Sequence, residues 1–358
     1  MSAINRLSRQ PRSPVHGAGG FDARGFTLIE LLVVIAIITL LIAILLPSLS
    51  AARKQGQAVK CAANLHDIGT AMASYLADWD GVYPPAYIYP ADQQATYDFF
   101  DQNPTHPFGY LHWSWFLYSK GQVGDKAFQC PGYFNGGAPR TNPGSSGSDW
   151  ESGQVDQNGT SSSNDTLADA QAPRMAYTGN AAIFPRNKFT QDLSAAEGGG
   201  LRTNVFTLQT KVGDTAKTIL LTEFLNNWQA IAVQSSGGLL SKSHRSINPF
   251  YHVGAGTNEY SAPVDTPGFT YGDAPHYGVL PKQQAEEAVC VMDNPGVPEI
   301  NAVGRHHPGG DAYSGGAANF AYADGHVEKR GVLQTMENRE WGQYYYAING
   351  ANKVGPPW

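Results

Sequence analysis

One apolar run near the N-terminus constrains this chain more than any other feature of its sequence. The run extends from Phe26 to Leu46, and Glu30 is its only strongly polar member. About 20 apolar residues are enough to cross the hydrocarbon core of a bilayer as a helix. A carboxylate inside such a helix costs on the order of 2.5 to 3.5 kcal/mol unless a partner compensates it. The sequence therefore predicts a transmembrane helix at residues 26–46 whose Glu30 needs a partner.

The residues at the start of this run resemble a family signature. The segment from Gly25 to Ile38 is similar to the N-terminal motif of type IV pilins and of the pseudopilins of type II secretion systems. The resemblance implies that prepilin peptidase cuts between Gly25 and Phe26 and that the new N-terminus of Phe26 is methylated. It also implies that Glu30 meets the free amine of a neighbouring subunit during filament assembly. The alternative is an ordinary signal anchor with an accidental Glu.

In this family, residues 1–25 would be a cytoplasmic leader peptide. They contain four arginines and one aspartate, a net charge of +3, so their removal takes the chain from −6 to −9. An acidic exported domain disfavours nucleic acid as a partner, since no basic stripe is left to neutralise phosphates. Arg53, Lys54 and Lys60 follow the apolar run closely, so the positive-inside rule decides orientation only weakly. The motif instead implies a single-pass protein of the bacterial cytoplasmic membrane with its head in the periplasm or outside, which can be extracted into a filament.

A helical pattern continues beyond the apolar run. Asp80-Gly81 and then Pro84-Pro85 supply stop signals. We therefore expect one helix over residues 26–80, with its first half in lipid and its second half in water against the head. The second half is predicted from apolar residues that recur mostly every three or four positions; they are Leu49, Ala52, Gly56, Val59, Ala63, Ile68, Met72, Tyr75, Leu76 and Trp79.

Residues 81–358 are predicted to form a β-rich head. The chain has 40 Gly and 23 Pro with only 15% charged residues, a composition typical of short strands and turns. Strands are expected at 175–180 and 218–223, and a hairpin with a two-residue turn at Asp324-Gly325. The segment 112–118 fits either a short helix or a strand. The predicted fold is α+β: a long N-terminal helix packed on an antiparallel β-sheet head with long loops, the pilin-like lollipop.

The polar segment 132–173 is predicted to be a solvated loop. Its acidic residues could bind calcium, but they lack the alternation and the glycine of an EF-hand loop. We therefore predict no cofactor, with calcium as the alternative. The acidic residues concerned are Asp149, Glu151, Asp156, Asp165 and Asp169.

The three cysteines are Cys61, Cys130 and Cys290. A disulfide is permitted on the outer side of the membrane, and an odd count leaves at least one thiol free or paired between chains. Large pseudopilin-like proteins often have a Cys in the early helix and a Cys-Pro further on, so the resemblance implies a disulfide between Cys61 and Cys130.

The C-terminal part also resembles prepilin-like proteins, in which a His is followed by nine residues and then Asp-Gly. Here 16 residues separate His307 from Asp324, which an insertion around 311–316 would explain. One interpretation is a site for a divalent metal or ligand formed by His307, Asp311 and Asp324, with His306 and His326 nearby. The favoured interpretation is turn and loop chemistry, in which Asp324 bonds backbone amides and a His ties the loop to the sheet.

These features predict a structural subunit of a type IV pilus or of a type II secretion pseudopilus, involved in secretion or surface filament assembly. Its expected partners are prepilin peptidase, copies of itself or other pseudopilins, and the inner-membrane assembly platform. A membrane-tethered module that binds polysaccharide or an exported protein is the alternative, because Trp113, Trp115 and Tyr118 cluster. An enzyme is not expected, since the chain lacks a Gly-x-Ser-x-Gly elbow, a zinc motif and a convincing acid–base pair. Glu223, at a predicted strand end, has no identifiable partner.

Overall fold

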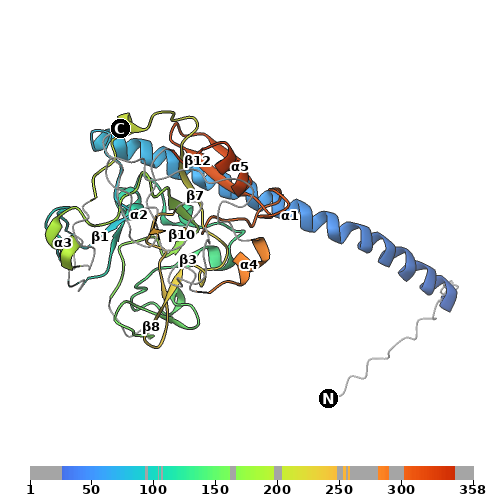
Figure 1. The fold of residues 1–358 in the computed structure, drawn as a ribbon. Helices are drawn as coiled ribbons and strands as arrows, with labels where there is room; N and C mark the ends of the chain where they lie inside the picture. The colour runs from blue at the N-terminus through green and yellow to red at the C-terminus, as the bar shows by residue number, and fades with distance from the viewer. Residues whose placement is uncertain are drawn as a thin grey trace, which may run out of the picture. The chain divides into compact units, whose positions relative to one another are not determined.

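A computed structural model describes residues 26–92, 96–103, 105, 108–161, 167–196, 204–247, 253–254, 257–258, 281–289 and 302–342. The leader with Gly25, as well as Cys290, lies outside the described residues. The chain divides into two compact units, Met1–Ala51 and Ala52–Trp358. The fold is α+β, as predicted, with one long N-terminal helix and a main sheet that is antiparallel (Figure 1). One of the smaller sheets contains a parallel pair.

Helix α1 spans Leu28–Asp78 and matches the predicted long helix closely. Thr27 and Glu30 form a reciprocal cap at its start, since the N–H of Glu30 donates to the Thr27 hydroxyl at 3.2 Å. In return, the N–H of Thr27 donates to the Glu30 carboxylate at 2.9 Å. Pro47 lies inside α1 without ending it. The part of α1 before Ala51 is long and apolar enough to cross a membrane, and its apolar side chains are exposed.

The second half of α1 buries one face. Cys61, Leu65, Ile68, Met72 and Tyr75 follow one another at three- or four-residue spacing and belong to the core of the second unit. This is the amphipathic pattern of a helix packed on a head.

The predicted stripe is correct from Ile68 onwards but wrong before it. Val59 is 69% exposed and Leu49 is 67% exposed, whereas Ala58 is buried. The buried face of this part of the helix includes small residues such as Ala58. Because the prediction followed the spacing of larger apolar residues such as Val59, it selected the exposed face instead. The helix ends as predicted: Asp80 and Gly81 take positive φ, and the N–H of Gly81 donates to the Leu76 carbonyl at 2.8 Å.

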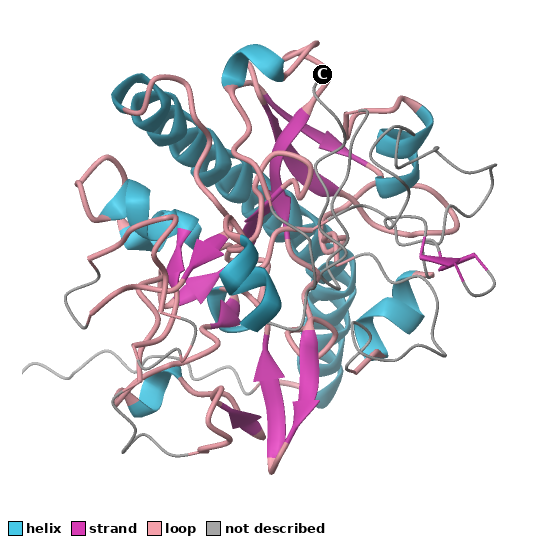
Figure 2. Cartoon of the chain, turned by 60° about the vertical axis from the view of Figure 1, so that its left-hand side comes forward, coloured by secondary structure: helices cyan, strands magenta, loops and turns pink. Residues whose placement is uncertain are grey.

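The main sheet of the head has four antiparallel strands in the order β13-β12-β7-β6 (Figure 2). These strands are β6 (Tyr177–Gly179), β7 (Ile219–Glu223), β12 (Ala318–Tyr322) and β13 (Val327–Arg330). Every residue of β7 and β12 is buried. The apolar run in β7 therefore indicated correctly a strand covered on both faces.

The predicted C-terminal hairpin is present as β12 and β13, but its turn is different. The N–H of Tyr322 donates to the His326 carbonyl, and the N–H of Gly325 donates to the Tyr322 carbonyl, both at 2.9 Å. Gly325 has φ 97°. The connection is thus a three-residue loop with a left-handed glycine, not the two-residue primed turn that Asp-Gly predicted.

Shorter elements surround this sheet. Segment 112–118 ends one short strand and forms the helix after it, so both interpretations hold in part. The remaining strands form three small pairings within the second unit, β1-β2, β3-β5 and β4-β9-β8, and a fourth, β10-β11. The elements are β1 (Tyr87–Ile88), β2 (Leu111–His112), α2 (Trp113–Tyr118), η1 (Asp125–Phe128), η2 (Phe134–Gly136), β3 (Ala138–Pro139), η3 (Gly147–Asp149), β4 (Gln154–Val155), β5 (Arg174–Met175), α3 (Gln191–Ala196), η4 (Gln209–Lys211), β8 (Ala232–Ser235), β9 (Gly238–Ser241), β10 (Val253–Gly254), β11 (Thr257–Asn258), α4 (Lys282–Glu287) and α5 (Val332–Glu337).

The polar segment 132–173 is not simply a solvated loop, which corrects the prediction. Asp169 is buried and accepts hydrogen bonds from the N–H of Tyr110 at 2.8 Å and from the N–H of Asn142 at 2.9 Å. Burial raises the pKa of Asp169 to about 6, although the hydrogen bonds from Asn142 and Tyr110 oppose this rise. The segment thus buries at least one carboxylate against backbone donors, which composition alone does not reveal.

Candidate functional sites

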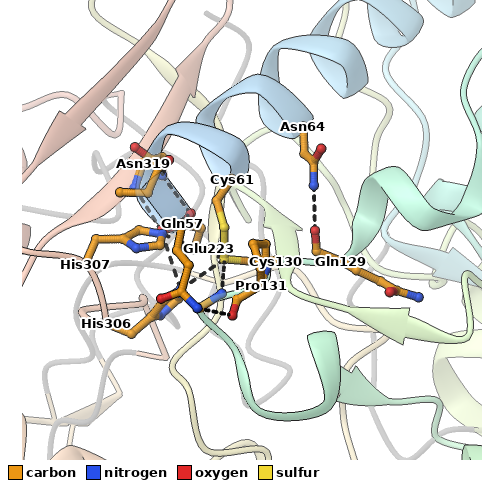
Figure 3. Close-up of a disulfide and its surroundings, with 12 residues drawn as sticks. Gln57, Cys61, Asn64, Gln129, Cys130, Pro131, Glu223, His306, His307 and Asn319 are labelled. Atoms are coloured by element: carbon orange, nitrogen blue, oxygen red, sulfur yellow. Dashed lines mark hydrogen bonds and ion pairs between the residues drawn. A yellow bond between two sulfur atoms is a disulfide. The ribbon is translucent and has the colours of Figure 1, made fainter. Parts of the chain in front are cut away.

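A disulfide joins α1 to the head. Cys61 of α1 and Cys130, two residues after η1, are bonded with their α-carbons 5.1 Å apart, and both are fully buried (Figure 3). This is the pairing that the resemblance implied. It links a helix to a segment 69 residues further along the chain.

Hydrogen bonds flank the disulfide on both sides. The amide of Asn64 donates to the Gln129 carbonyl at 2.6 Å, and the amide of Gln57 donates to the Pro131 carbonyl at 2.9 Å (Figure 3). On the sheet side, the hydroxyl of Tyr177 donates to the carbonyl of Cys61 at 3.2 Å. These contacts satisfy polar groups around the sulfurs and hold the helix in one register against the head.

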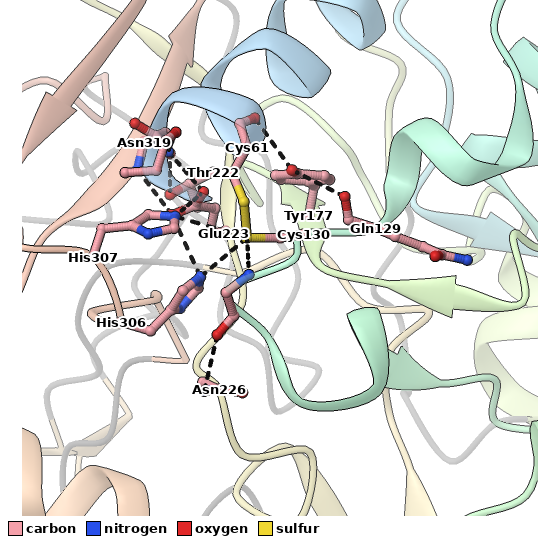
Figure 4. A network of polar contacts seen from close by, with 12 residues as sticks. Cys61, Gln129, Cys130, Tyr177, Thr222, Glu223, Asn226, His306, His307 and Asn319 are labelled. Carbon is pink, nitrogen blue, oxygen red and sulfur yellow. Dashed lines mark hydrogen bonds and ion pairs between the residues drawn. A yellow bond between two sulfur atoms is a disulfide. The ribbon is translucent and has the colours of Figure 1, made fainter. Parts of the chain in front are cut away.

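Glu223, the last residue of β7, is fully buried beside the disulfide. Its Oε1 lies 2.9 Å from His307 Nε2, and Asn319 donates both its backbone N–H and its side-chain amide to the carboxylate at 2.9 Å (Figure 4). The Asn319 amide also donates to the carbonyl of Ala58 on α1 at 3.1 Å. Burial alone would raise the pKa of Glu223, but the bond to His307, the neighbouring imidazoles and the Asn319 N–H lower it below its ordinary value.

The two histidines face the disulfide as well. His306 Nε2 lies 3.5 Å and His307 Nε2 lies 3.8 Å from the sulfur of Cys130 (Figure 4). Burial lowers the pKa of His306 to about 4, although Glu223 partly offsets this effect. His306 is therefore neutral at pH 7, and among the residues that the structure describes its buried Nδ1 has no hydrogen-bond partner.

Sequence reasoning missed the contact between Glu223 and His307. It found no partner for Glu223 because 84 residues separate the two. The available signal was the position of Glu223, because a carboxylate that ends an otherwise apolar, buried strand requires a buried partner.

The amino-terminal segment carries the second candidate site. Phe26 is 69% exposed. The carboxylate of Glu30 accepts hydrogen bonds from the N–H and the hydroxyl of Thr27, both at 2.9 Å. Within the described part of the chain, no cationic side chain pairs with Glu30. The carboxylate therefore lies at the start of the helix, against Thr27.

Comparisons with known proteins concern this same segment. A family model described as the prokaryotic N-terminal methylation motif matches residues 21–46. The type IV wide pilus major component PilA4 of Thermus thermophilus is 49% identical over 57 residues, which cover 16% of this chain and 44% of that protein. The amino-terminal segment is that of a type IV prepilin-like protein. The chain thus spans less than half the length of this relative, and no solved structure matches it.

The residues of the C-terminal part do not gather as the metal interpretation required. Asp311 accepts hydrogen bonds from the N–H of Tyr313 at 2.9 Å and from the N–H and hydroxyl of Ser314. Asp324 Oδ1 lies 2.6 Å from His326 Nδ1 in the hairpin turn. These are the turn and loop contacts of the favoured interpretation.

Strand geometry explains why the metal interpretation with Asp324 is wrong. His307 bridges to Ala317 just before β12, whereas Asp324 follows the other end of that strand. At roughly 3.3 Å per residue, the strand separates the two by about 20 Å. Among the described residues, the set of side chains that could share a metal ion is a different one, namely Cys61, Cys130, Glu223 and His307.

The aromatic cluster proposed for sugar binding packs into the head. Trp113 is fully buried, and Trp115 and Tyr118 are partly buried against the same core. Trp113 contacts Phe128 and Phe184 at centroid distances of 5.5 and 5.6 Å. Trp113 is therefore removed from the polysaccharide-binding alternative, since a ring inside the core cannot stack on a sugar. Trp115 and Tyr118 are only partly buried.

Proposed function

We propose that this chain is a structural subunit of a type IV pilus or of a type II secretion pseudopilus. The observation that carries the proposal is the methylation motif at residues 21–46, with Glu30 inside the exposed apolar half of α1. The similarity to PilA4 over 57 residues supports it. The role is mechanical: the subunit contributes a helix to a polymer and carries a head, and we assign it no catalysis.

In this proposal, prepilin peptidase cuts between Gly25 and Phe26, and the new amine of Phe26 is methylated. The amine then lies one residue before the helix cap at Thr27. Its positive charge is unfavourable there, because the N-terminal end of a helix already carries a partial positive charge. A carboxylate removes this penalty, and Glu30 of a neighbouring subunit supplies it during assembly.

The first half of α1 requires an apolar environment. Its side chains from Leu28 to Leu46 are exposed, with Leu28 at 79% and Ile44 at 66%. We propose that a bacterial cytoplasmic membrane covers them before assembly and that neighbouring helices cover them in the filament, with the head in the periplasm or outside. The partners would then be prepilin peptidase, other copies or pseudopilins, and the assembly platform in the membrane.

Replacement of Glu30 tests this proposal. Glu30→Gln keeps an oxygen that can accept the Thr27 N–H, so the helix cap survives while the charge is lost. In cells with a complete assembly system, we expect processing at residue 25 to persist while the subunit disappears from the sheared filament fraction. Glu337→Gln, which removes an exposed carboxylate from α5, is the matched control and should still assemble. Normal incorporation of Glu30→Gln would refute the proposed pairing.

A further inference from the structure

Four potential metal ligands converge where α1 meets the head. The sulfurs of Cys61 and Cys130, a carboxylate oxygen of Glu223 and a ring nitrogen of His307 all lie within 4.8 Å of one another. All four side chains are buried, and they come from α1, the segment after η1, the end of β7 and the segment before β12 (Figure 4). In the oxidised chain, the two sulfurs are bonded to each other.

The donor types are those of a zinc site. Zinc binds thiolate sulfur at about 2.3 Å and imidazole nitrogen or carboxylate oxygen at about 2.0 to 2.2 Å, in a tetrahedron. The ligand atoms of such a tetrahedron lie roughly 3.3 to 3.8 Å apart. Cys130 Sγ and His307 Nε2 are already separated by 3.8 Å. His307 Nε2 and Glu223 Oε1 are 2.9 Å apart, so they would have to separate slightly to become two ligands of one ion.

The sulfur pair needs the largest adjustment. Two sulfurs that are no longer bonded move apart to van der Waals contact, which is close to the roughly 3.8 Å edge that two zinc-bound thiolates require. Breaking the disulfide therefore carries the pair towards the zinc geometry.

We propose that the dithiol form of this chain binds one zinc ion through Cys61, Cys130, Glu223 and His307. A dithiol reductant supplies two electrons and two protons and becomes a disulfide, which breaks the sulfur–sulfur bond of the chain and leaves two thiols. With a phosphine, the phosphine supplies the two electrons and becomes a phosphine oxide, and one water molecule supplies its oxygen and the two protons. Zinc then displaces the two thiol protons. In the reverse direction, a disulfide-bearing oxidant accepts two electrons and two protons as the bond re-forms, and the metal leaves.

Buried polar groups support the proposed ligands. Asn319 donates to Glu223 from its backbone and side chain and so orients the carboxylate, as outer-layer partners of metal ligands do. His306 Nε2 lies 3.5 Å from Cys130 Sγ, and among the described residues its buried Nδ1 has no hydrogen-bond partner. The imidazole thus lies beside the sulfur that would become a thiolate. The consequence is that α1 stays fastened to the head in either redox state, by a covalent bond or by a metal.

Zinc titration of the full chain in detergent micelles tests the proposal. The chain is reduced with a phosphine, freed of metal, titrated with zinc alone and analysed for bound metal. We expect one zinc per reduced chain, and no stoichiometric zinc in the oxidised chain. Cys290→Ala is the control and should bind like the wild type. Cobalt(II) in place of zinc should show thiolate-to-metal charge-transfer absorption.

Two variants separate ligand loss from misfolding. Glu223→Gln and His307→Gln retain both cysteines, so each variant's fold is checked by melting of the oxidised form before reduction. After reduction, each should bind zinc at least about tenfold more weakly, as loss of a ligand or of its support requires. Should both variants fail to fold, the cobalt spectrum of the reduced wild type decides. A reduced wild type without stoichiometric zinc, or a cobalt complex without thiolate absorption, would overturn the proposal.

Discussion

Removing the disulfide should have a large and calculable effect on the stability of the head. The variant Cys61→Ala/Cys130→Ala deletes a link that closes 69 residues of chain between α1 and the segment after η1. For a loop of this length, the chain-entropy relation gives about 4 kcal/mol of lost stability at 25 °C. The unfolded chain gains this freedom, whereas the folded contacts around Asn64 and Tyr177 remain.

The assay is thermal unfolding of the full chain in detergent, followed by near-ultraviolet circular dichroism of the buried aromatic residues. A chelator keeps the sample free of metal, so that the redox state alone differs. For a head of this size, a loss of 4 kcal/mol corresponds to a fall in melting temperature of roughly 10 °C. Reduction of the wild type should lower the melting temperature by a similar amount.

Cys290→Ala is the matched control, because it removes a thiol without opening the link. It should change the melting temperature by no more than about 2 °C, as expected for a substitution worth about 0.5 kcal/mol. The reasoning fails if the double variant melts within 2 °C of the oxidised wild type. It also fails if the control and the double variant lose the same stability.

Three further perturbations test the description of the head. Burial lowers the pKa of His112 and His244 well below the ordinary value of 6.5. The unfolded chain therefore takes up protons that the folded chain does not bind, so the free energy of unfolding should fall as pH drops below 6.5, by at most about 2 kcal/mol per histidine at pH 5. The melting temperature should fall with it, and His244→Gln should show a shallower fall. Gly316→Ala should destabilise the head more than Gly325→Ala: both glycines have positive φ, but a Cβ at Gly316 meets the Arg305 carbonyl, whereas the space around Gly325 is open. Equal losses of unfolding free energy for Gly316→Ala and Gly325→Ala, measured by urea denaturation, would contradict this. Trp113→Ala should cost about 3 to 5 kcal/mol in the same assay, because the ring is fully buried, and it should leave retention on polysaccharide resins unchanged.

The sequence predicts the elements that depend on local patterns. The long helix is recovered because its apolar run, its cap and its stop at Asp80-Gly81 are all contiguous signals. Strand β7 is recovered because its run of Ile and Leu is typical of a strand covered on both faces, and all five of its residues are buried. The hairpin at β12 and β13 is recovered from the turn signal of Asp324-Gly325, although the turn length depends on backbone geometry that the pair Asp-Gly does not determine alone.

The contacts between α1, the disulfide and the sheet could not be predicted from the sequence. Glu223 and His307 are 84 residues apart, and only the order β12-β7 brings them together. The disulfide was available from resemblance, not from spacing. The burial of Asp169 was not predicted, because a polar composition is typical of a solvated loop. It depends on hydrogen bonds from the N–H groups of Tyr110 and Asn142, which are distant in the sequence.

The central claim, that this chain is a processed subunit, is tested most directly by the mass of its mature N-terminus. The chain is purified from cells that contain an active prepilin peptidase, and its N-terminal peptide is sequenced by mass spectrometry. We predict that residues 1–25 are absent and that the first residue is Phe26 carrying one additional methyl group. A chain that still begins at Met1, or that is cut at another bond, would contradict the account.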